Sequence, residues 1–268
     1  MIKLFENNLK TQNRQSSKGN QLKWETDGTW YKADYTGYEG LSEYVVSELL
    51  RRSSLLPGEY VLYEPERIKY KATIYKGCKS RDFTGGLQVI TLERLFKNQY
   101  GISLNACIYT LNNVVDRLKY LVEQVERTTG IPDFGVYMCK LLTVDALFLN
   151  EDRHTHNISV LMSENGTFRL CPVYDNGAAL LSDTTMDYPP EMDIFNAIRI
   201  VKAKTLCDSF EEQLEAAEAM YGQNISFSWN EKDIDDILCQ TDIYENRTKN
   251  RVKEILLEQK RKFGYLFI

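Results

Sequence analysis

The stretch that most constrains the fold is residues 133–150, DFGVYMCKLLTVDALFLN. It is apolar around nearly its whole helical circumference, and such a helix is stable only where protein surrounds it. Pro132 directly before it is typical of a first helical turn. The chain is therefore predicted to fold around a buried central helix, and 268 residues, 43% of them hydrophobic, are enough to build that core.

The pattern before this helix is that of a sheet. Two strand-like runs flank Asp27-Gly28, a dipeptide typical of tight hairpin turns. Residues 40–52 have the spacing of a helix, and residues 59–63 and 68–75 alternate as strands do. The first 85 residues are therefore predicted to form a small sheet with one helix.

The pattern from residue 105 onward is mainly helical. Asn165-Gly166 predicts one further hairpin, and residues 209–222, 233–240 and 251–262 are predicted to be helices. A stripe of six apolar residues predicts a helix that Gly130 ends: Ile108, Leu111, Val115, Leu118, Val122 and Val125.

The expected fold class is therefore α+β, with two lobes. Residues 1–85 form a β-rich N-lobe and residues 86–268 a mostly helical C-lobe. A net charge of −5 is not that of a general nucleic-acid binder. Six widely spaced cysteines favour reduced, buried thiols, and no signal peptide or membrane helix is evident, so we expect a cytoplasmic protein without a membrane partner.

Both histidines of the chain lie in LFLNEDRHTHNISVL, residues 147–161. A metal-hydrolase centre would combine His154 and His156 with Asp152 and Asp175. Such centres usually recruit further histidines, and none remain. Zinc also favours nitrogen and sulfur ligands, whereas the remaining groups are mostly carboxylate and amide oxygens.

Phosphoryl transfer fits the same residues better. Asp152 lies five residues before Asn157, which is the spacing of a kinase catalytic loop between its base and its second-metal asparagine. A hairpin then leads to Asp175, the first residue of a D-x-G triplet. The order of base, asparagine, hairpin and D-x-G predicts a site for ATP and Mg²⁺, because magnesium favours oxygen ligands.

The front of the chain supplies the remaining parts of such a site. Lys32 lies on a predicted strand, where it could bind ATP phosphates, and the next helix offers a glutamate to hold it. Upstream, a small polar loop could meet phosphate oxygens with its backbone N–H groups. Its residues are Ser16, Ser17, Lys18 and Gly19.

The stretches FLNEDRHTHNISVL and CPVYDNGAALL resemble the HipA-like serine/threonine protein kinases of bacteria, which carry N-x-D-R-H-x-x-N and a downstream Y-D. WYKADY and GYEGLSEYVVSELL resemble their nucleotide lysine and the helix after it. The resemblance implies a bilobal protein-kinase-like fold. It implies Asp152 as catalytic base, Asn157 and Asp175 as magnesium ligands, and Lys32 as the ATP-phosphate ligand with Glu43 as its partner.

Members of this family also phosphorylate a serine of their own phosphate-binding loop, a place that Ser16 and Ser17 match. The resemblance implies a protein substrate with a Ser or Thr hydroxyl, and the acidic net charge predicts no direct nucleic-acid binding. Toxin members bind an antitoxin through an extra N-terminal subdomain. Only about 15 residues precede the loop here, so we expect a short, single-domain form, and an antitoxin partner stays open. The alternatives are a small-molecule or lipid kinase on the same fold and a nucleotide-binding pseudokinase.

The other loop residues have expected structural roles. His154 is expected to brace the loop by hydrogen bonds and His156 to be exposed. Asn150 and Asp145 are expected to tie the loop to the preceding helix. Arg153 is either a brace of the loop or a phosphate contact.

The glutamate that pairs with Lys32 is a further open point. The resemblance indicates Glu43, whereas the helical periodicity places Glu48 on the apolar side of the helix.

Overall fold

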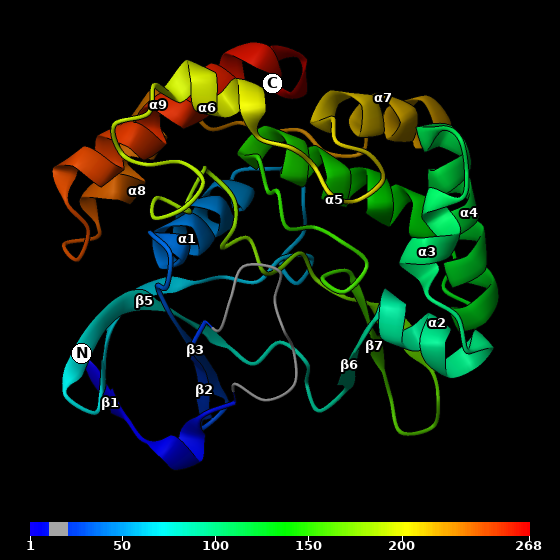
Figure 1. The fold of residues 1–268 in the computed structure, drawn as a ribbon, viewed down its shortest axis with the longest axis horizontal. Coiled ribbons are helices and arrows are strands. Elements are labelled where there is room, and N and C mark those ends of the chain that lie inside the picture. Colours follow the sequence, from blue (N-terminus) through cyan, green and yellow to red (C-terminus); the bar gives the residue numbers. More distant parts are fainter. Residues whose placement is uncertain (11–20) are drawn as a thin grey trace. The chain divides into compact units, whose positions relative to one another are not determined.

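The computed structural model describes residues 1–10 and 21–268 (Figure 1). By its internal contacts the chain divides into two compact units, each assembled from separate stretches of sequence. Unit 1 comprises Met1–Phe83, Tyr174–Val201 and Ser226–Ile268, and unit 2 comprises Thr84–Val173 and Lys202–Ile225. One boundary lies beside the predicted division after residue 85, and the units are otherwise discontinuous, so the lobes 1–85 and 86–268 stay a prediction.

Unit 1 contains a five-stranded sheet with the order β1-β4-β5-β3-β2. β1 is parallel to β4, and the other neighbours are antiparallel. The strands are β1 Ile2–Leu4, β2 Lys23–Thr26, β3 Thr29–Ala33, β4 Glu64–Tyr70 and β5 Thr73–Arg81.

The hairpin predicted at Asp27-Gly28 is confirmed, because β2 and β3 pair up to Thr26 and Thr29 on either side of it. The strand predicted at 59–63 is wrong, because this range precedes β4. The range 68–75 is extended as predicted, but it comprises the end of β4 and the start of β5 with a turn at 71–72 between them. Lys71 makes that turn with a φ of 53°. Glycine or asparagine usually occupies such a position, and neither is present here to signal the turn.

The helices of unit 1 are α1 Glu39–Leu50, α6 Ile194–Ile200, α8 Glu231–Cys239 and α9 Asn246–Lys262, with short 3₁₀ turns at Glu6–Asn8 and Gly264–Leu266. α1 packs against β5, β4 and α8, and α9 packs against α6 and α8. α1 and β5 approach closely where both carry glycine. A Cβ on Gly40 would lie 2.5 Å from the backbone of Gly77, so larger side chains would separate the helix from the sheet.

Asp34, just after β3, holds the first turn of α1. Its Oδ1 accepts the Gly40 N–H at 2.6 Å and its Oδ2 accepts the Tyr244 hydroxyl at 2.9 Å. Burial, reinforced by the nearby Glu39 carboxylate, raises the pKa of Asp34 from 3.8 to about 7. The folded state therefore binds this proton more tightly than the unfolded state does, and Asp34 lowers the free energy of unfolding as the pH rises from about 4 to about 7.

We expect Asp34→Asn, which cannot titrate, to flatten this pH dependence. A difference of about three pKa units corresponds to on the order of 4 kcal/mol between the ends of the window. Urea unfolding of both proteins at pH 5 and pH 8 measures it. If the loss of stability between the two pH values is the same in both, the shifted carboxyl is not Asp34.

Unit 2 contains a three-stranded antiparallel sheet in the order β6-β7-β8, from Gln88–Thr91, Ser159–Met162 and Phe168–Leu170. Its helices are α2 Leu92–Tyr100, α3 Leu104–Tyr109, α4 Val114–Thr129, α5 Phe134–Phe148 and α7 Phe210–Tyr221. The predicted central helix is confirmed as α5, which packs against α7 and α4 (Figure 1). Every residue of α5 except Val136 and Lys140 is buried.

The single helix expected from residue 105 to Gly130 is two helices, α3 and α4. The helix is interrupted at 110–113, because Asn113 caps the start of α4 by accepting the Asp116 N–H at 2.8 Å. The hairpin at Asn165-Gly166 and the helices beginning near 210, 231 and 246 are confirmed.

All six cysteines are free. Cys78, Cys139 and Cys171 are buried as expected. Cys239 is exposed, because α8 buries Ile234, Ile237 and Leu238 instead. Among the helices within the described residues, none combines the length and the hydropathy needed to span a bilayer.

Candidate active site

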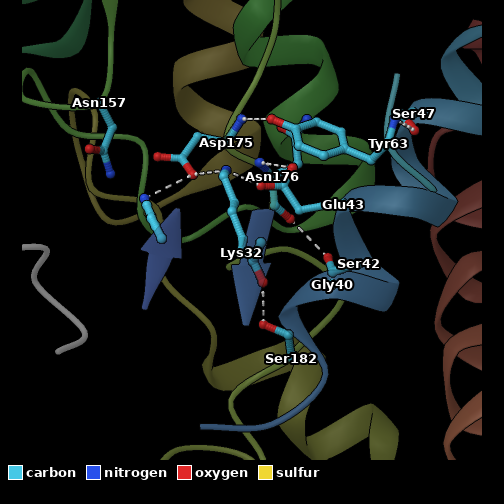
Figure 2. Close-up of polar contacts among 12 residues, drawn as sticks. Lys32, Gly40, Ser42, Glu43, Ser47, Tyr63, Asn157, Asp175, Asn176 and Ser182 are labelled. Atoms are coloured by element: carbon cyan, nitrogen blue, oxygen red, sulfur yellow. Dashed lines mark hydrogen bonds and ion pairs between the residues drawn. The ribbon is translucent and has the colours of Figure 1, made fainter. Parts of the chain in front are cut away.

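Unit 1 brings together three charged residues that are far apart in the sequence (Figure 2). The Nζ of Lys32 on β3 lies 2.5 Å from Oε1 of Glu43 on α1 and 2.7 Å from Oδ1 of Asp175. The side chain of Glu43 is 1% exposed and that of Lys32 12%, whereas that of Asp175 is 25% exposed. The cluster is thus a buried ion pair with one carboxylate that reaches solvent.

The alternation of β3 places Lys32 toward α1. Tyr31 and Ala33 on either side of it face the main core of the sheet, so Lys32 points to the opposite face. There it is paired with Cys78 of β5, which packs with Tyr63 in a second apolar cluster. The Lys32 side chain therefore extends over this apolar cluster to its two carboxylate partners.

The carboxylates keep Lys32 charged. Burial acts to lower the pKa of its ammonium group, but Asp175 and Glu43 outweigh burial and raise this pKa well above its ordinary value. A fixed positive charge beside a partly exposed carboxylate is suited to binding an anion together with a cation.

The D-N-G triplet is held by α1. Asp175 has a φ of 60°, in the left-handed region. The N–H of Asn176 donates to Oε2 of Glu43 at 2.8 Å. The hydroxyl of Ser42 donates to the carbonyls of Asn176 and Ala179, at 2.9 Å each. Glu43 thus positions both the lysine and the triplet, and the helix and the triplet are coupled.

Tyr63 completes the surroundings of Lys32 (Figure 2). Its ring centroid lies 5.2 Å from the Lys32 Nζ, a cation–π contact. Its hydroxyl accepts the N–H of Asp175 at 3.5 Å, and its own N–H donates to the Ser47 hydroxyl of α1 at 3.1 Å. A buried aromatic side chain therefore fixes the position of the lysine from above.

The structure decides between Glu43 and Glu48. Lys32 pairs with Glu43, as the resemblance implied, whereas Glu48 pairs with Arg51. Helical periodicity pointed to Glu48 because it assumes one polar face. α1 has almost none, since ten of its twelve residues are buried. The role of the pair in nucleotide binding stays a prediction.

The histidine loop belongs to unit 2 and is tightly built. The Nδ2 of Asn157 donates to the carbonyl of Asp152 at 2.8 Å and to its Oδ2 at 3.1 Å. Asp152 is 9% exposed. The predicted base and the predicted magnesium ligand therefore touch within this unit, and the contact fixes the rotamer of the carboxylate.

Arg153 braces the loop, which settles the choice left open by the sequence. Its side chain is 2% exposed, and its Nε lies 3.1 Å from both carboxylate oxygens of Asp145 on α5. The N–H of Asn150 donates to the carbonyl of Asp145 at 2.9 Å, and the Thr205 hydroxyl donates to the carbonyl of Arg153 at 2.5 Å. The expected tie of Asn150 and Asp145 to the preceding helix is confirmed.

The histidines act within the loop. The Nδ1 of His154 accepts the N–H of His156 at 3.2 Å, which confirms the expected brace, and His156 is exposed as expected. Burial lowers the pKa of His154, although Asp152 opposes the shift. A neutral ring that accepts at Nδ1 carries its proton on Nε2, which lies 3.6 Å from Oδ1 of Asp152.

The predicted residues thus form two groups. Lys32, Glu43 and Asp175 meet in unit 1, and Asp152 and Asn157 meet in unit 2. Within the described ranges, no group of three or more histidine, cysteine or acidic side chains could hold a metal ion, which gives the metal-hydrolase alternative no support. The predicted phosphate loop lies outside the described residues: Ser16, Ser17, Lys18 and Gly19.

Sequence reasoning missed Ser42, Tyr63 and Asn176. Ser42 and Asn176 carried a weak signal, because each is a polar residue adjoining a predicted site residue inside an apolar stretch. Tyr63 carried none, since its contacts to Lys32 and Asp175 cross 31 and 112 residues of chain and only the folded sheet brings them together.

The fold is that of a protein kinase-like structure. A crystal structure of the proinflammatory kinase CtkA of Helicobacter pylori matches with a TM-score of 0.59 and 16% sequence identity, over 97% of this chain and 94% of that one. No protein-family model matches the sequence. No curated protein matches it either. The predicted α+β, kinase-like fold is therefore confirmed, and the likeness rests on structure.

Proposed function

We propose that this protein is an ATP- and Mg²⁺-dependent serine/threonine protein kinase of the HipA-like type, acting in the cytoplasm and phosphorylating itself. The observation that carries the proposal is the Lys32–Glu43–Asp175 cluster, a buried cation oriented by one carboxylate beside a second, partly exposed one. The likeness to a solved kinase over nearly the whole chain supports the same class of activity.

The residues fit ATP and magnesium by their chemistry. Lys32 offers a permanent positive charge for phosphate oxygens. The carboxylate of Asp175 and the amide oxygen of Asn157 are oxygen donors of the kind that Mg²⁺ prefers. The Asn157 nitrogen is already used on Asp152, so the amide oxygen is the atom left for a cation. When bound, ATP would supply the phosphoryl group, and Mg²⁺ would neutralise negative charge on the phosphate oxygens.

Asp152 would act as the base. Its carboxylate would orient the serine or threonine hydroxyl of the acceptor and take its proton as the oxygen attacks. Asn157 holds one carboxylate oxygen at 3.1 Å, and neutral His154 lies 3.6 Å from the other. The ion pair of Arg153 and Asp145 anchors the loop to α5. The Asp152 carboxylate is therefore held in position before the acceptor binds.

Asp175→Ala should weaken Mg²⁺-dependent ATP binding more than Asn157→Ala does, because a carboxylate contributes a full charge to magnesium and an amide only a dipole. Calorimetric titration of ATP with and without Mg²⁺ on both variants measures this. The magnesium effect should fall most in Asp175→Ala. Equal affinities in all four titrations would contradict a metal role for either residue.

Incubation of the purified protein with γ-labelled ATP and Mg²⁺, alone and with dephosphorylated casein, tests the proposed reaction. We expect label on serine or threonine of casein, and peptide mapping should find label on Ser16 or Ser17 of the protein itself. Label appearing only on an added lipid or small molecule would favour that class of kinase. ATP binding without transfer to any acceptor would indicate a pseudokinase.

A further inference from the structure

Unit 1 contains a pocket of about 540 Å³ whose lining residues do not include Lys32, Glu43 or Asp175. Four segments line it: the start of α1, β5, the stretch from Thr184 to α6, and the start of α9. α6 and α9 lie against each other (Figure 1), and residues of both line the pocket. Pockets of this volume are within the range that binds small organic molecules.

One of the lining residues is a buried arginine that, within the described ranges, donates to backbone carbonyls and not to a carboxylate. Arg251 on α9 is 8% exposed, and its terminal nitrogens donate to the carbonyls of Met192 at 3.2 Å and Tyr188 at 3.4 Å. Among the described residues no carboxylate lies within ion-pair distance of it, and its buried Nε has no hydrogen-bond partner. The guanidinium therefore meets only neutral groups, including the phenol of Tyr38.

The other buried arginine among the described residues, Arg153, is compensated, and so is the mostly buried Lys32. Arg153 faces the Asp145 carboxylate at 3.1 Å, and Lys32 lies between Glu43 and Asp175. A buried charge without a counterion is costly to the fold. An uncompensated guanidinium beside a pocket thus points to an anionic partner that comes from outside the chain.

The remaining lining limits the ligand. Three cations and three carboxylates line the pocket, and the carboxylates would repel a polyanion: Lys76, Arg247 and Arg251 against Asp193, Glu245 and Glu254. Tyr38, Phe195 and Tyr244 add aromatic surface, and Phe195 is 61% exposed. The lining is suited to one oxyanion on an otherwise apolar or aromatic body.

We propose that this pocket is a binding site for a small organic anion, whose single phosphate or carboxylate group is bound by Arg251. The proposal does not depend on the kinase function. Occupancy would place the ligand against Tyr38, which precedes α1 and whose hydroxyl donates to the carbonyl of Leu180 at 2.6 Å. The pocket is therefore lined by the residue that directly precedes α1, the helix that carries Glu43.

Phenyl phosphate and benzoate are suitable probes, titrated into the full-length protein by calorimetry. We expect saturable binding of at least one of them, with a Kd on the order of 1 mM, and the stronger probe identifies the preferred oxyanion. Lys32→Met should bind equally well, which separates this pocket from the proposed nucleotide site. Absence of saturable binding of both probes would overturn the proposal.

Arg251→Met should weaken the better probe by roughly tenfold or more, because a charge-assisted contact is lost. Without ligand the variant should melt at the same temperature as the wild type or higher, since an uncompensated buried charge is removed. The matched control Arg199→Met removes an exposed arginine on α6 that does not line the pocket, and it should bind normally. Equal binding by Arg251→Met and wild type would contradict the assignment.

Phe195→Ala tests the pocket without risk to the core, because this side chain is mostly exposed. It should weaken the aromatic probe by roughly threefold to tenfold through lost apolar contact. Unchanged affinity in both Phe195→Ala and Arg251→Met would place the bound probe elsewhere on the protein and sink the proposal.

Discussion

Asp152→Asn should lower the rate of phosphoryl transfer by about 10²–10⁴ while leaving the fold and ATP binding intact. The carboxamide has the shape of the carboxylate and retains an oxygen that can accept the hydrogen bond from Asn157. It cannot take the proton of the acceptor hydroxyl. Single-turnover transfer from MgATP, together with calorimetric ATP affinity, measures the two effects separately.

A surface substitution provides the control for this experiment. Asp208→Asn changes the same chemical group in unit 2, at an exposed carboxylate that pairs with Lys202. It should transfer phosphate at the wild-type rate. If Asp152→Asn does so too, Asp152 is not the base, whatever else the loop binds.

Arg153→Met should be among the most destabilising single changes in the chain, at about 3–5 kcal/mol. The substitution leaves the Asp145 carboxylate buried, with no exposed surface, and without the guanidinium that faces it at 3.1 Å. Burial already raises the pKa of Asp145 to about 6, even though Arg153 lowers it. Without Arg153 that pKa should rise further.

This shift has a definite sign. A carboxyl whose pKa is higher in the folded state than in the unfolded state loses stability as the pH rises through the interval between the two values. The deficit of Arg153→Met should therefore be larger at pH 8 than at pH 5, as measured by urea unfolding. The double variant Arg153→Met/Asp145→Leu should recover most of the loss, because it buries no charge. A deficit independent of pH would contradict this account.

The parts of the site that depend on local sequence were predictable. The spacing of Asp152 and Asn157 and the hairpin signals at Asp27-Gly28 and Asn165-Gly166 each act within a few residues. The buried helix α5 was evident because apolar residues surround it. These features are fixed by short-range geometry and by hydrophobic pattern.

The parts that depend on packing were not predictable. The turn at Lys71 carries no turn signal, so the sequence predicts one strand over 68–75 where the structure has the end of β4 and the start of β5. The hydrogen bonds from Ser42 to the D-N-G triplet join residues 134 and 137 positions apart. Periodicity favoured Glu48 over Glu43, because a helix buried on nearly all sides has no polar face to orient the prediction.

Lys32, Glu43 and Asp175 form the proposed site for ATP phosphates, whatever the acceptor. Calorimetric titration of MgATP into the wild type, Lys32→Met and Lys79→Met tests it most directly. Lys79 lies on the neighbouring strand β5 and pairs with Glu64 and Glu66, so it is the matched control.

We predict saturable binding in the wild type and Lys79→Met, and an affinity lower by roughly tenfold or more in Lys32→Met, since charge-assisted contacts to phosphate are lost. Wild-type protein that does not bind MgATP, or Lys32→Met that binds it as tightly as the wild type, would contradict the account.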